Sequence, residues 1–313
     1  MNNVVEKANL EVFADTLLEL GKKNKDIIVV TSDSRGSGKL VPFGEELPEQ
    51  IIEVGIAEQN LVGISAGLSA GGKIVFGVSP SSFLTARSLE QIKNDVAYSN
   101  HPTKLIGISS GISYGQLGST HHSIHDLAVL RTINNLTIVV PADNFETRES
   151  IKQSVNYNKP IFIRFGKKPM MKIHNNNQNF QIGKAIKVLI GSDVTFIAIG
   201  ETVQRAVLAS HILKKEGITS TVVSMHTLKP FDEKTFLESL IRSKALITIE
   251  EHSINGGLGE KCASIISQNN INIPFKILGI PDEYMINGSQ SDVLDHYDME
   301  PEKISKIAKK MLK

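Results

Sequence analysis

The sequence changes character at Glu53-Val54-Gly55-Ile56-Ala57-Glu58-Gln59-Asn60, which leads from a polar passage with glycine and proline into the small, apolar segment Leu61 to Gly71. Glycine ahead of that segment, with a carboxylate in its first turn, predicts a loop that delivers Glu58 to the N-terminus of a helix. Gly63 and Gly67 lie four residues apart in this helix, so they share a face that a second helix can approach closely. An unpaired buried carboxylate is costly, so Glu58 is either buried with a partner or an exposed capping residue, and the stretch alone leaves both readings open.

Length and composition predict two domains and narrow the classes of partner. The chain has 313 residues and a formal net charge of +1, so neither nucleic acid nor a membrane is an expected partner. No window reaches the roughly 18 apolar residues of a membrane span. The segment Met1 to Lys7 lacks the apolar core of a signal peptide. The one cysteine, Cys262, permits no internal disulfide and fits a reducing cytoplasm, and its helical surroundings predict a buried apolar role rather than a nucleophile.

Strand and helix patterns alternate through the first half of the chain. The run Ile27 to Val30 is continuously apolar, which is typical of a strand covered on both faces. The expected strands are 27–30, 73–78, 104–108, 137–140 and 161–164, and the expected helices are 5–21, 58–71, 82–99, 125–131 and 144–157. This alternation predicts an α/β fold, a parallel sheet with helices on both faces, whose site lies beyond the carboxyl ends of the strands.

A polar, asparagine-rich passage over 167–181 is the best candidate for a linker. We expect one domain over 1–170, a linker over 171–184 and a smaller α/β domain over 185–313. Its expected strands are 194–199, 221–224, 245–249 and 275–278, and its expected helices are 202–215, 233–242, 257–267 and 302–312. In this domain Glu250-Glu251-His252 precedes a glycine turn and is either an interface element or a solvated strand end.

Two glycine-rich loops invite comparison with phosphate-binding loops. Arg35-Gly36-Ser37-Gly38-Lys39 follows the first strand and offers backbone donors and two cations to an anion. It lacks the spacing of a P-loop, and Gly256-Gly257-x-Gly259 likewise falls short of the dinucleotide fingerprint. Turn-forming glycines are therefore the default interpretation of both loops.

The loop Gly115 to His125 is richer in chemistry, with three histidines in five positions among small residues. His121 and His125 have the spacing to share a metal, but neither a neighbouring H-E-x-x-H pattern nor a nearby cysteine supports this, so a substrate-facing histidine is favoured. Arg164 ends a strand and is either an anion binder or an interface ion pair. Phe83, which starts a helix together with Arg87, is either core or a stacking platform.

Three motifs in this order resemble the transketolase family of thiamine-diphosphate enzymes, specifically the C-terminal half. They are Val54-Gly55-Ile56-Ala57-Glu58-Gln59-Asn60, Leu89-Glu90-Gln91-Ile92-Lys93-Asn94-Asp95 and Gly118-Ser119-Thr120-His121-His122, which match the family's G-I-x-E-[QH] segment, the following helix and its G-x-T-H-Q loop. The likeness covers nearly the whole chain, and it implies a pyrimidine-binding domain followed by a transketolase C-terminal domain.

The resemblance implies roles for six residues. Glu58 would hydrogen-bond a ring nitrogen of the cofactor's aminopyrimidine and share a proton with it, which requires shielding from water. Phe83 would stack on the pyrimidine, and Arg87 would belong to the same cofactor site. His121 would contact substrate oxygens around the reacting carbonyl. Arg164 and Ser37 would hold the phosphate of the sugar.

The positions at which this sequence departs from the family pattern bear on its partner and its substrate. No G-D-G…N motif is present, so the resemblance implies a split enzyme whose partner, an N-terminal transketolase subunit, supplies the diphosphate site and the Mg²⁺ ligands in an α2β2 assembly. Leu117 stands where the family has an aspartate and Ser109 where it has a histidine, and an expected arginine is replaced near Asn9 or Leu10. A branched, deoxy or sulfonated sugar phosphate is compatible with these changes.

We therefore expect the C-terminal subunit of a split transketolase, which transfers a two-carbon ketol unit from a ketose phosphate to an aldose. The alternatives are the β subunit of a 2-oxo-acid dehydrogenase first component and a non-catalytic, partner-binding subunit. The pair Thr120-His121 beside Gly118 favours a transketolase over the dehydrogenase subunit. Retention of Glu58 favours a catalytic subunit over one that only binds a partner.

Overall fold

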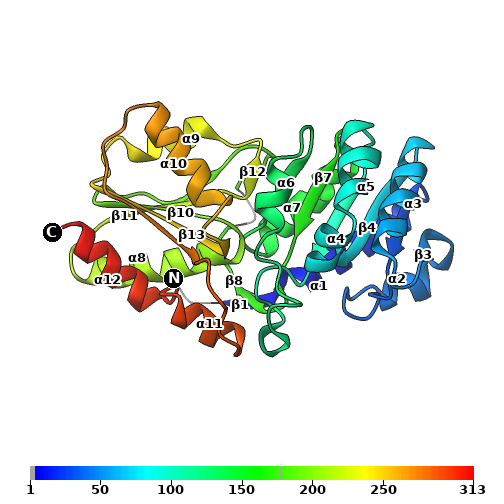
Figure 1. Ribbon diagram of the computed structural model, residues 1–313, viewed down its shortest axis with the longest axis horizontal. Helices are drawn as coiled ribbons and strands as arrows, with labels where there is room; N and C mark the ends of the chain where they lie inside the picture. The colour runs from blue at the N-terminus through cyan, green and yellow to red at the C-terminus, as the bar shows by residue number, and fades with distance from the viewer. Residues whose placement is uncertain (1–3, 176–177) are drawn as a thin grey trace.

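The largest of the three sheets in the computed structural model, which describes residues 4–175 and 178–313, has the strand order β12-β6-β7-β5-β4-β2-β3 (Figure 1). Its strands are β2 (Ile27–Thr31), β3 (Ile51–Glu53), β4 (Ile74–Pro80), β5 (Lys104–Ile108), β6 (Thr137–Val139), β7 (Ile161–Arg164) and β12 (Thr227–Lys229). All run parallel except β12, which pairs antiparallel with β6. The strands at the centre are buried on both faces, as their continuous apolar runs predict.

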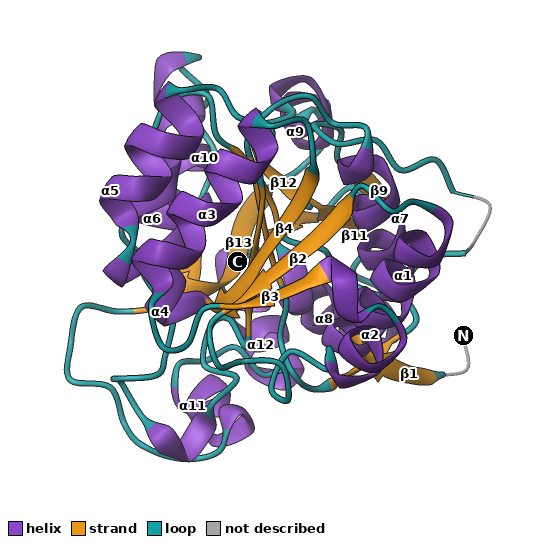
Figure 2. Cartoon of the chain, turned by 90° about the vertical axis from the view of Figure 1, so that its right-hand side faces the viewer, coloured by secondary structure: helices purple, strands orange, loops and turns teal. Residues whose placement is uncertain are grey.

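Helices cover both faces of this sheet, as Figure 2 shows. One layer contains α1 (Asn9–Lys23), α2 (Val41–Glu46) and α7 (Asn144–Val155), and the other contains α3 (Glu58–Ala70), α4 (Ser81–Arg87), α5 (Leu89–Gln91), the π-helical turn η2 (Ile92–Tyr98) and α6 (Asp126–Arg131). Short 3₁₀ turns lie at η1 (Pro48–Gln50) and η3 (Gly115–Leu117). Glu58 is the first residue of α3, so the predicted loop-to-helix delivery of its carboxylate is confirmed.

The second half of the chain forms a smaller sheet in the order β14-β13-β10-β11-β9. Its strands are β9 (Ile186–Leu189), β10 (Val194–Ala198), β11 (Ser220–Ser224), β13 (Ala245–Ser253) and β14 (Phe275–Ile280), and only β9 pairs antiparallel. The helices are α8 (Val203–Lys215) and α12 (Pro301–Met311) on one face, α9 (Glu233–Leu240) and α10 (Leu258–Gln268) on the other, and α11 (Gln290–His296), with a 3₁₀ turn η4 (Gly200–Thr202) (Figure 1). The α/β fold of both halves is therefore as the sequence predicts.

Two predicted helices need correction. The helix expected over 5–21 begins only at Asn9, because its first residues form the strand β1 (Val5–Ala8), which pairs with β8 (Pro169–Met171). The helix expected over 82–99 is broken at Ser88, whose hydroxyl donates to the Leu84 carbonyl inside the same turn, and it continues as a π-helical turn.

The passage expected to be a linker is more ordered than its composition suggests. It contains β8, and His174 in it is 1% exposed and lies beside Asp143 and Glu146 of the α7 region. Residues 176 and 177, at the centre of the asparagine-rich run, lie outside the described residues.

The two halves share apolar packing. One cluster of buried side chains includes Leu61 and Val96 from the first half and Leu258 and Cys262 from the second. Cys262 is fully buried, as predicted, and burial raises the pKa of its thiol well above the usual value. No helix in the described part of the chain is long and apolar enough to cross a membrane.

Candidate active site

Loops at the carboxyl edge of the larger sheet carry the candidate residues. Ser37 follows β2, Glu58 follows β3, Phe83 follows β4 and His121 follows β5. Parallel strands place their carboxyl ends at one edge, so side chains that are far apart in sequence converge there. This edge is where the sequence predicts the site.

Glu58 is buried at the start of α3 and has an arginine as its partner. Its residue exposure is 4%, and Arg87 Nη1 donates to both carboxylate oxygens, over 2.9 Å to Oε1 and 3.0 Å to Oε2. The Arg87 side chain remains 48% exposed, so the pair joins a buried anion to a cation at the surface. Of the two readings of Glu58 that the sequence leaves open, the buried carboxylate with a partner is the one observed.

Aromatic contacts connect Glu58's partner to the histidine loop. The Arg87 guanidinium lies 4.3 Å from the centroid of the Phe83 ring, and the Phe83 and His121 rings meet edge to face with a centroid separation of 5.3 Å. Tyr114 contacts the same histidine at 5.3 Å, and Lys167 Nζ lies 4.5 Å from the Tyr114 ring centroid. One continuous set of contacts therefore joins four of the predicted site residues to two that were not predicted.

The loop that carries Ser37 lies beside this set. The Ser37 hydroxyl donates to the Ser34 carbonyl over 3.1 Å, which shapes the turn. Partial burial lowers the pKa of Lys167, and the positive charge of Lys39 from the Ser37 loop lowers it further. The two lysines therefore sit close enough to repel each other, and an anion between them would relieve that repulsion.

Arg164 lies elsewhere, buried behind the carboxyl edge. It is 3% exposed, its Nη1 donates to Asp126 Oδ1 over 2.6 Å, and its Nη2 donates to the Glu251 carbonyl over 3.0 Å. Burial by itself raises the pKa of Asp126, but the charge of Arg164 and the hydrogen bonds from Arg164 and Ser81 outweigh it and hold that pKa below its usual value. Its guanidinium is therefore held in an ion pair within the first domain and bonded to the second, and phosphate binding by Arg164 stays a prediction.

The residues at this edge fit half of a thiamine-diphosphate site. A buried carboxylate that can meet a ring nitrogen and an aromatic ring that can stack are the groups that an aminopyrimidine requires. The hydroxyls of Ser82, which precedes Phe83 in sequence, and of Ser109, which follows β5, are buried without a hydrogen-bond partner among the described residues, which leaves polar capacity for a ligand. Residues 4–175 and 178–313 hold no group of three or more His, Cys, Asp or Glu side chains suited to a metal ion.

Sequence reasoning missed Tyr114, Asp126 and Lys167. Tyr114 directly precedes the glycine with which the predicted histidine loop begins, and Lys167 follows β7 at the same sheet edge, so a search of every strand's carboxyl end could have found both. The assignment of 167–181 to a linker by composition concealed Lys167. No local signal marks Asp126 as the partner of Arg164.

Two family profiles match the chain in sequence order. The profile described as "Transketolase, pyrimidine binding domain" matches residues 6–172, and that described as "Transketolase, C-terminal domain" matches residues 183–304. Together they cover the larger sheet, the smaller sheet and the edge that carries Glu58 and His121.

Curated relatives and a solved structure agree with these profiles. An apulose-4-phosphate transketolase subunit from Phocaeicola vulgatus is 44% identical over 313 residues, which is 100% of this chain and 99% of the relative. The 6-deoxy-6-sulfo-D-fructose transketolase subunit of Clostridium sp. is 34% identical over 272 residues, 87% of this chain and 84% of the relative. A solved structure described as a split gene transketolase, inactive β4 tetramer, is 32% identical with a TM-score of 0.89, and the match covers 98% of both chains.

Proposed function

The chain belongs to the transketolase family, and we propose that it is the C-terminal subunit of a split transketolase, which transfers a two-carbon ketol unit from a ketose phosphate to an aldose acceptor. The observation that carries the proposal is the buried carboxylate of Glu58 at an accessible sheet edge, in one set of contacts with Phe83 and His121. A carboxylate held there for structural reasons alone would not need an aromatic platform and a histidine beside it.

The family depends on thiamine diphosphate, and the chemistry that this cofactor supplies when bound is an electron sink for breaking a carbon–carbon bond next to a carbonyl. We assign to Glu58 the exchange of a proton with a ring nitrogen of the aminopyrimidine, and to Phe83 the stacking surface. Burial of the carboxylate excludes water from this exchange.

Arg87 controls whether Glu58 and Phe83 can meet the cofactor in this assignment. Its guanidinium now covers both the carboxylate of Glu58 and the ring of Phe83. The two groups that would meet the pyrimidine are therefore occupied by the same side chain, which must move aside for them to act. Its 48% exposure leaves it room to do so while remaining near the cofactor site.

The donor substrate in this proposal is a ketose phosphate. His121 Nδ1 is engaged with the Thr120 hydroxyl over 3.0 Å, so Nε2 is the nitrogen that would hold a substrate oxygen. Since Arg164 is buried in its ion pair, we assign the phosphate to Lys167, Lys39 and the Ser37 loop. The named substrates of the relatives, apulose 4-phosphate and a sulfonated fructose, support a modified sugar with a terminal anion.

A partner subunit completes the proposed site. It would supply the diphosphate-binding domain and the Mg²⁺ ligands in an α2β2 assembly. The description of the similar solved structure as an inactive β4 tetramer supports dependence on a second chain. A Cβ at Gly63 or Gly67 would meet nothing within 4 Å, so this face of α3 is open to close contact with another subunit. Light scattering of the active enzyme should give the mass of the tetramer, and a stable, active monomer would overturn the assembly. The cytoplasmic location stays a prediction.

The test is a reconstitution of the chain with its N-terminal subunit, assayed with ketose phosphates and, separately, with a 2-oxo acid. Glu58→Gln should lower ketose turnover by roughly 100-fold or more, because the amide cannot exchange the proton, while assembly with the partner is unchanged. Glu49→Gln, at an exposed glutamate of the same domain, is the control and should keep full activity. Full activity of Glu58→Gln would refute the mechanism and favour a merely partner-binding subunit. Turnover of the 2-oxo acid alone would instead favour the dehydrogenase alternative.

A further inference from the structure

The carboxyl end of β13 in the second half of the chain is buried against the loop that carries His121. Glu250, Glu251 and His252 are all buried, so of the two readings that the sequence leaves open, the interface element is observed and the solvated strand end is not. The proposed mechanism uses none of these residues. Three of the four residues from Glu250 to Ser253 contact either the His121 loop or the helix that follows it.

The His121 loop, residues 111–125, is closed at its neck. Ser123 N donates to the Gly111 carbonyl over 2.7 Å, and the two residues form an isolated β-bridge. Tyr114 and His121 lie within the closed part and contact each other. Because the neck is short, anything that fixes Gly111 and Ser123 also fixes where His121 stands.

Glu251 holds the first end of the loop. Its Oε1 accepts from Ile112 N over 2.7 Å and from Gln290 Nε2 over 2.8 Å. A Cβ at Gly111 would lie 2.5 Å from the same oxygen, and the φ of Gly111 is +61°, so the loop approaches the carboxylate as only glycine allows. Ile112 is buried in the apolar cluster of the second domain.

Ser253 and His252 hold the other end. Ser253 N donates to the Ile124 carbonyl over 2.8 Å, and Ala128 N in α6 donates to His252 Nε2 over 3.2 Å. The His252 Nδ1 donates to the Ser253 carbonyl over 2.7 Å, which leaves Nε2 as the acceptor. Burial lowers the pKa of His252 to about 4, so the ring is neutral at ordinary pH and this arrangement is kept.

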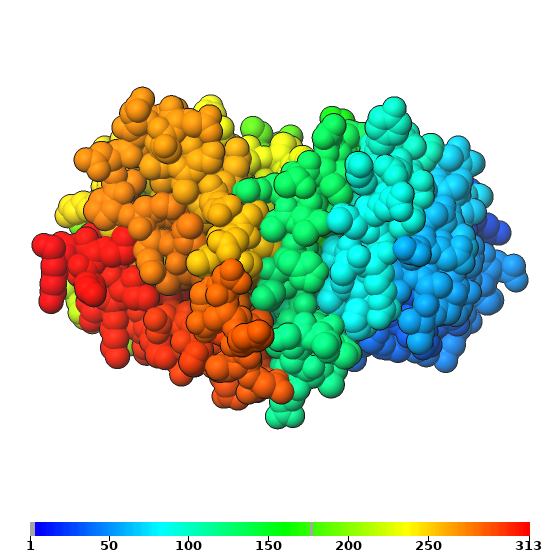
Figure 3. Space-filling model, in the orientation of Figure 1, coloured from blue at the N-terminus to red at the C-terminus, as the bar shows by residue number. Residues whose placement is uncertain are grey.

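The middle of the loop also rests on the second domain. A Cβ at Gly115 would lie 3.3 Å from the Gly288 carbonyl and 3.4 Å from Gln290 N, and one at Gly118 would lie 3.6 Å from the Asn287 side chain. In Figure 3 the loop, in green, meets the dark orange segment of the second domain at the lower edge of the molecule. The loop is thus supported at both ends and along its length.

We propose that the second domain is the clamp that positions the substrate-binding loop, with Glu251 as the positioning residue that fixes the entry of that loop and so the place of His121. This inference rests on the proposed function, because only that function makes His121 a substrate contact. Glu251 touches neither substrate nor cofactor in this assignment. It acts through the Ile112 amide.

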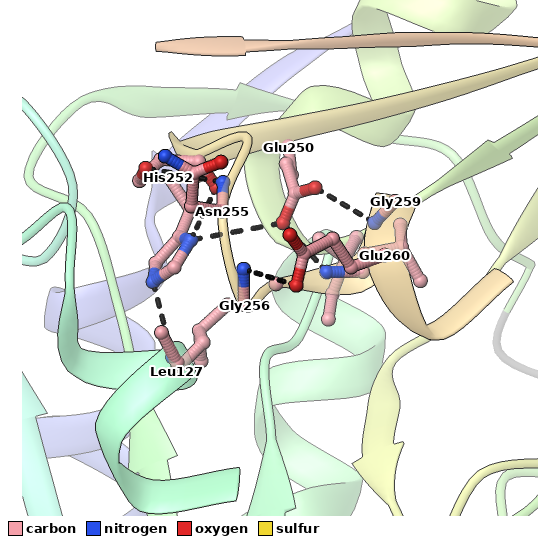
Figure 4. Close-up of polar contacts among 12 residues, drawn as sticks. Leu127, Glu250, His252, Asn255, Gly256, Gly259 and Glu260 are labelled. Atoms are coloured by element: carbon pink, nitrogen blue, oxygen red, sulfur yellow. Dashed lines mark hydrogen bonds and ion pairs between the residues drawn. The ribbon is translucent and has the colours of Figure 1, made fainter. Parts of the chain in front are cut away.

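The neighbouring Glu250 offers a matched control. It accepts from Leu258 N and Gly259 N, over 2.7 and 2.8 Å, and so caps α10 within its own domain. Figure 4 shows His252 directed toward the start of α6, while Glu250 is directed toward the first turn of α10. Glu250 and Glu251 are therefore adjacent buried carboxylates that each accept two hydrogen bonds. Only Glu251 bonds to the loop itself, and Glu250 Oε2 lies 3.8 Å from His252 Nδ1.

The experiment compares Glu251→Ala, Glu251→Gln and Glu250→Ala in the full chain, with amide hydrogen exchange of peptides from 111–125 and steady-state kinetics of the reconstituted enzyme. Glu251→Ala should speed exchange in this loop by about 10-fold or more, since the two hydrogen bonds that this side chain accepts are lost. It should raise the KM for the ketose phosphate by a similar factor while the KM for thiamine diphosphate changes less than about 2-fold. Glu251→Gln keeps the accepting oxygen, so its loop exchange and its KM for the ketose phosphate should lie close to those of the wild type. Glu250→Ala should leave the loop exchange and this KM near the wild-type values.

Equal loop exchange in Glu251→Ala and Glu250→Ala overturns the clamp. Should Glu251→Ala fail to fold, Gln290→Ala removes one of the two donors and is measured in its place, with the same direction expected. The exchange readout needs no activity, so a reconstituted enzyme that turns over no ketose phosphate refutes the proposed function while the exchange data still decide the clamp.

Discussion

The buried pair between Asp126 and Arg164 gives the sharpest prediction about what stabilises the first domain where it meets the second. The Asp126 carboxylate accepts from Arg164 Nη1 over 2.6 Å, and also from the Ser81 and Ser123 hydroxyls and Leu127 N over 2.7, 2.9 and 2.8 Å. Arg164 in turn donates to the Glu251 carbonyl across the domain boundary. Asp126→Asn keeps the shape and one acceptor oxygen but leaves the buried guanidinium without a counter-charge.

The expected cost follows from burial. Asp126 is fully buried and Arg164 is 3% exposed, so solvent screens the pair very little. Removing one partner of such a pair typically costs about 3–5 kcal/mol, because the remaining charge is left uncompensated. The serine hydroxyls can rotate to accept from the new amide, so we expect Asp126→Asn to lose about 3 kcal/mol, the lower end of the range.

The assay is urea unfolding at pH 7 and fixed protein concentration, read from the midpoint and slope. The control is Asp15→Asn, which breaks the exposed pair between Lys7 and Asp15 at the same 2.6 Å separation and should cost far less, because solvent screens that pair. The double variant Asp126→Asn with Arg164→Met should lose less unfolding free energy than the sum of the losses in the two single variants. Equal losses in Asp126→Asn and Asp15→Asn would refute the reasoning.

Two further predictions concern pH and substrate charge. Burial raises the pKa of Glu250 from 4.5 to about 7 in the folded chain, so the unfolded chain ionises first as pH rises. The contribution of this carboxyl to the free energy of unfolding is therefore complete below pH 4.5 and is lost as pH rises through 7. Between pH 5 and 8 the wild type should therefore lose about 2 kcal/mol more unfolding free energy than Glu250→Gln, and equal pH dependence would contradict this. Lys167→Ala should raise the KM for the ketose phosphate about 10-fold with a smaller change in kcat, because a phosphate contact is lost. The control, Lys172→Ala at an exposed lysine, should leave KM and kcat unchanged. An equal effect of the two substitutions would show that Lys167 does not bind the phosphate.

Much of the fold is readable from the sequence because it depends on local patterns. The β-branched run at 27–30 and the runs at 104–108 and 161–164 predict buried parallel strands, and all three are found. The rule that parallel strands end at one edge then places Glu58 and His121 together without any knowledge of packing.

The parts that local patterns do not predict depend on partners far away in the chain. The strand β1 forms because β8, more than 160 residues later, supplies its neighbour, and β12 crosses from the second half to extend the first sheet. Arg164 carries the same charge whether it faces substrate or protein, and only the positions of Asp126 and the Glu251 carbonyl decide between the two. The polar sequence around His174 predicts a solvated connector, and only its contacts with Asp143 and Glu146, which are distant in sequence, show that this histidine is buried.

The central claim is that this chain holds half of a thiamine-diphosphate site. The most direct measurement is calorimetric titration of thiamine diphosphate with Mg²⁺ into the chain alone and into the chain mixed with its N-terminal subunit. Binding only in the mixture is the predicted result, since the described residues offer a carboxylate and a ring for the pyrimidine but no set of side chains for the metal. Tight binding by the chain alone would contradict the account.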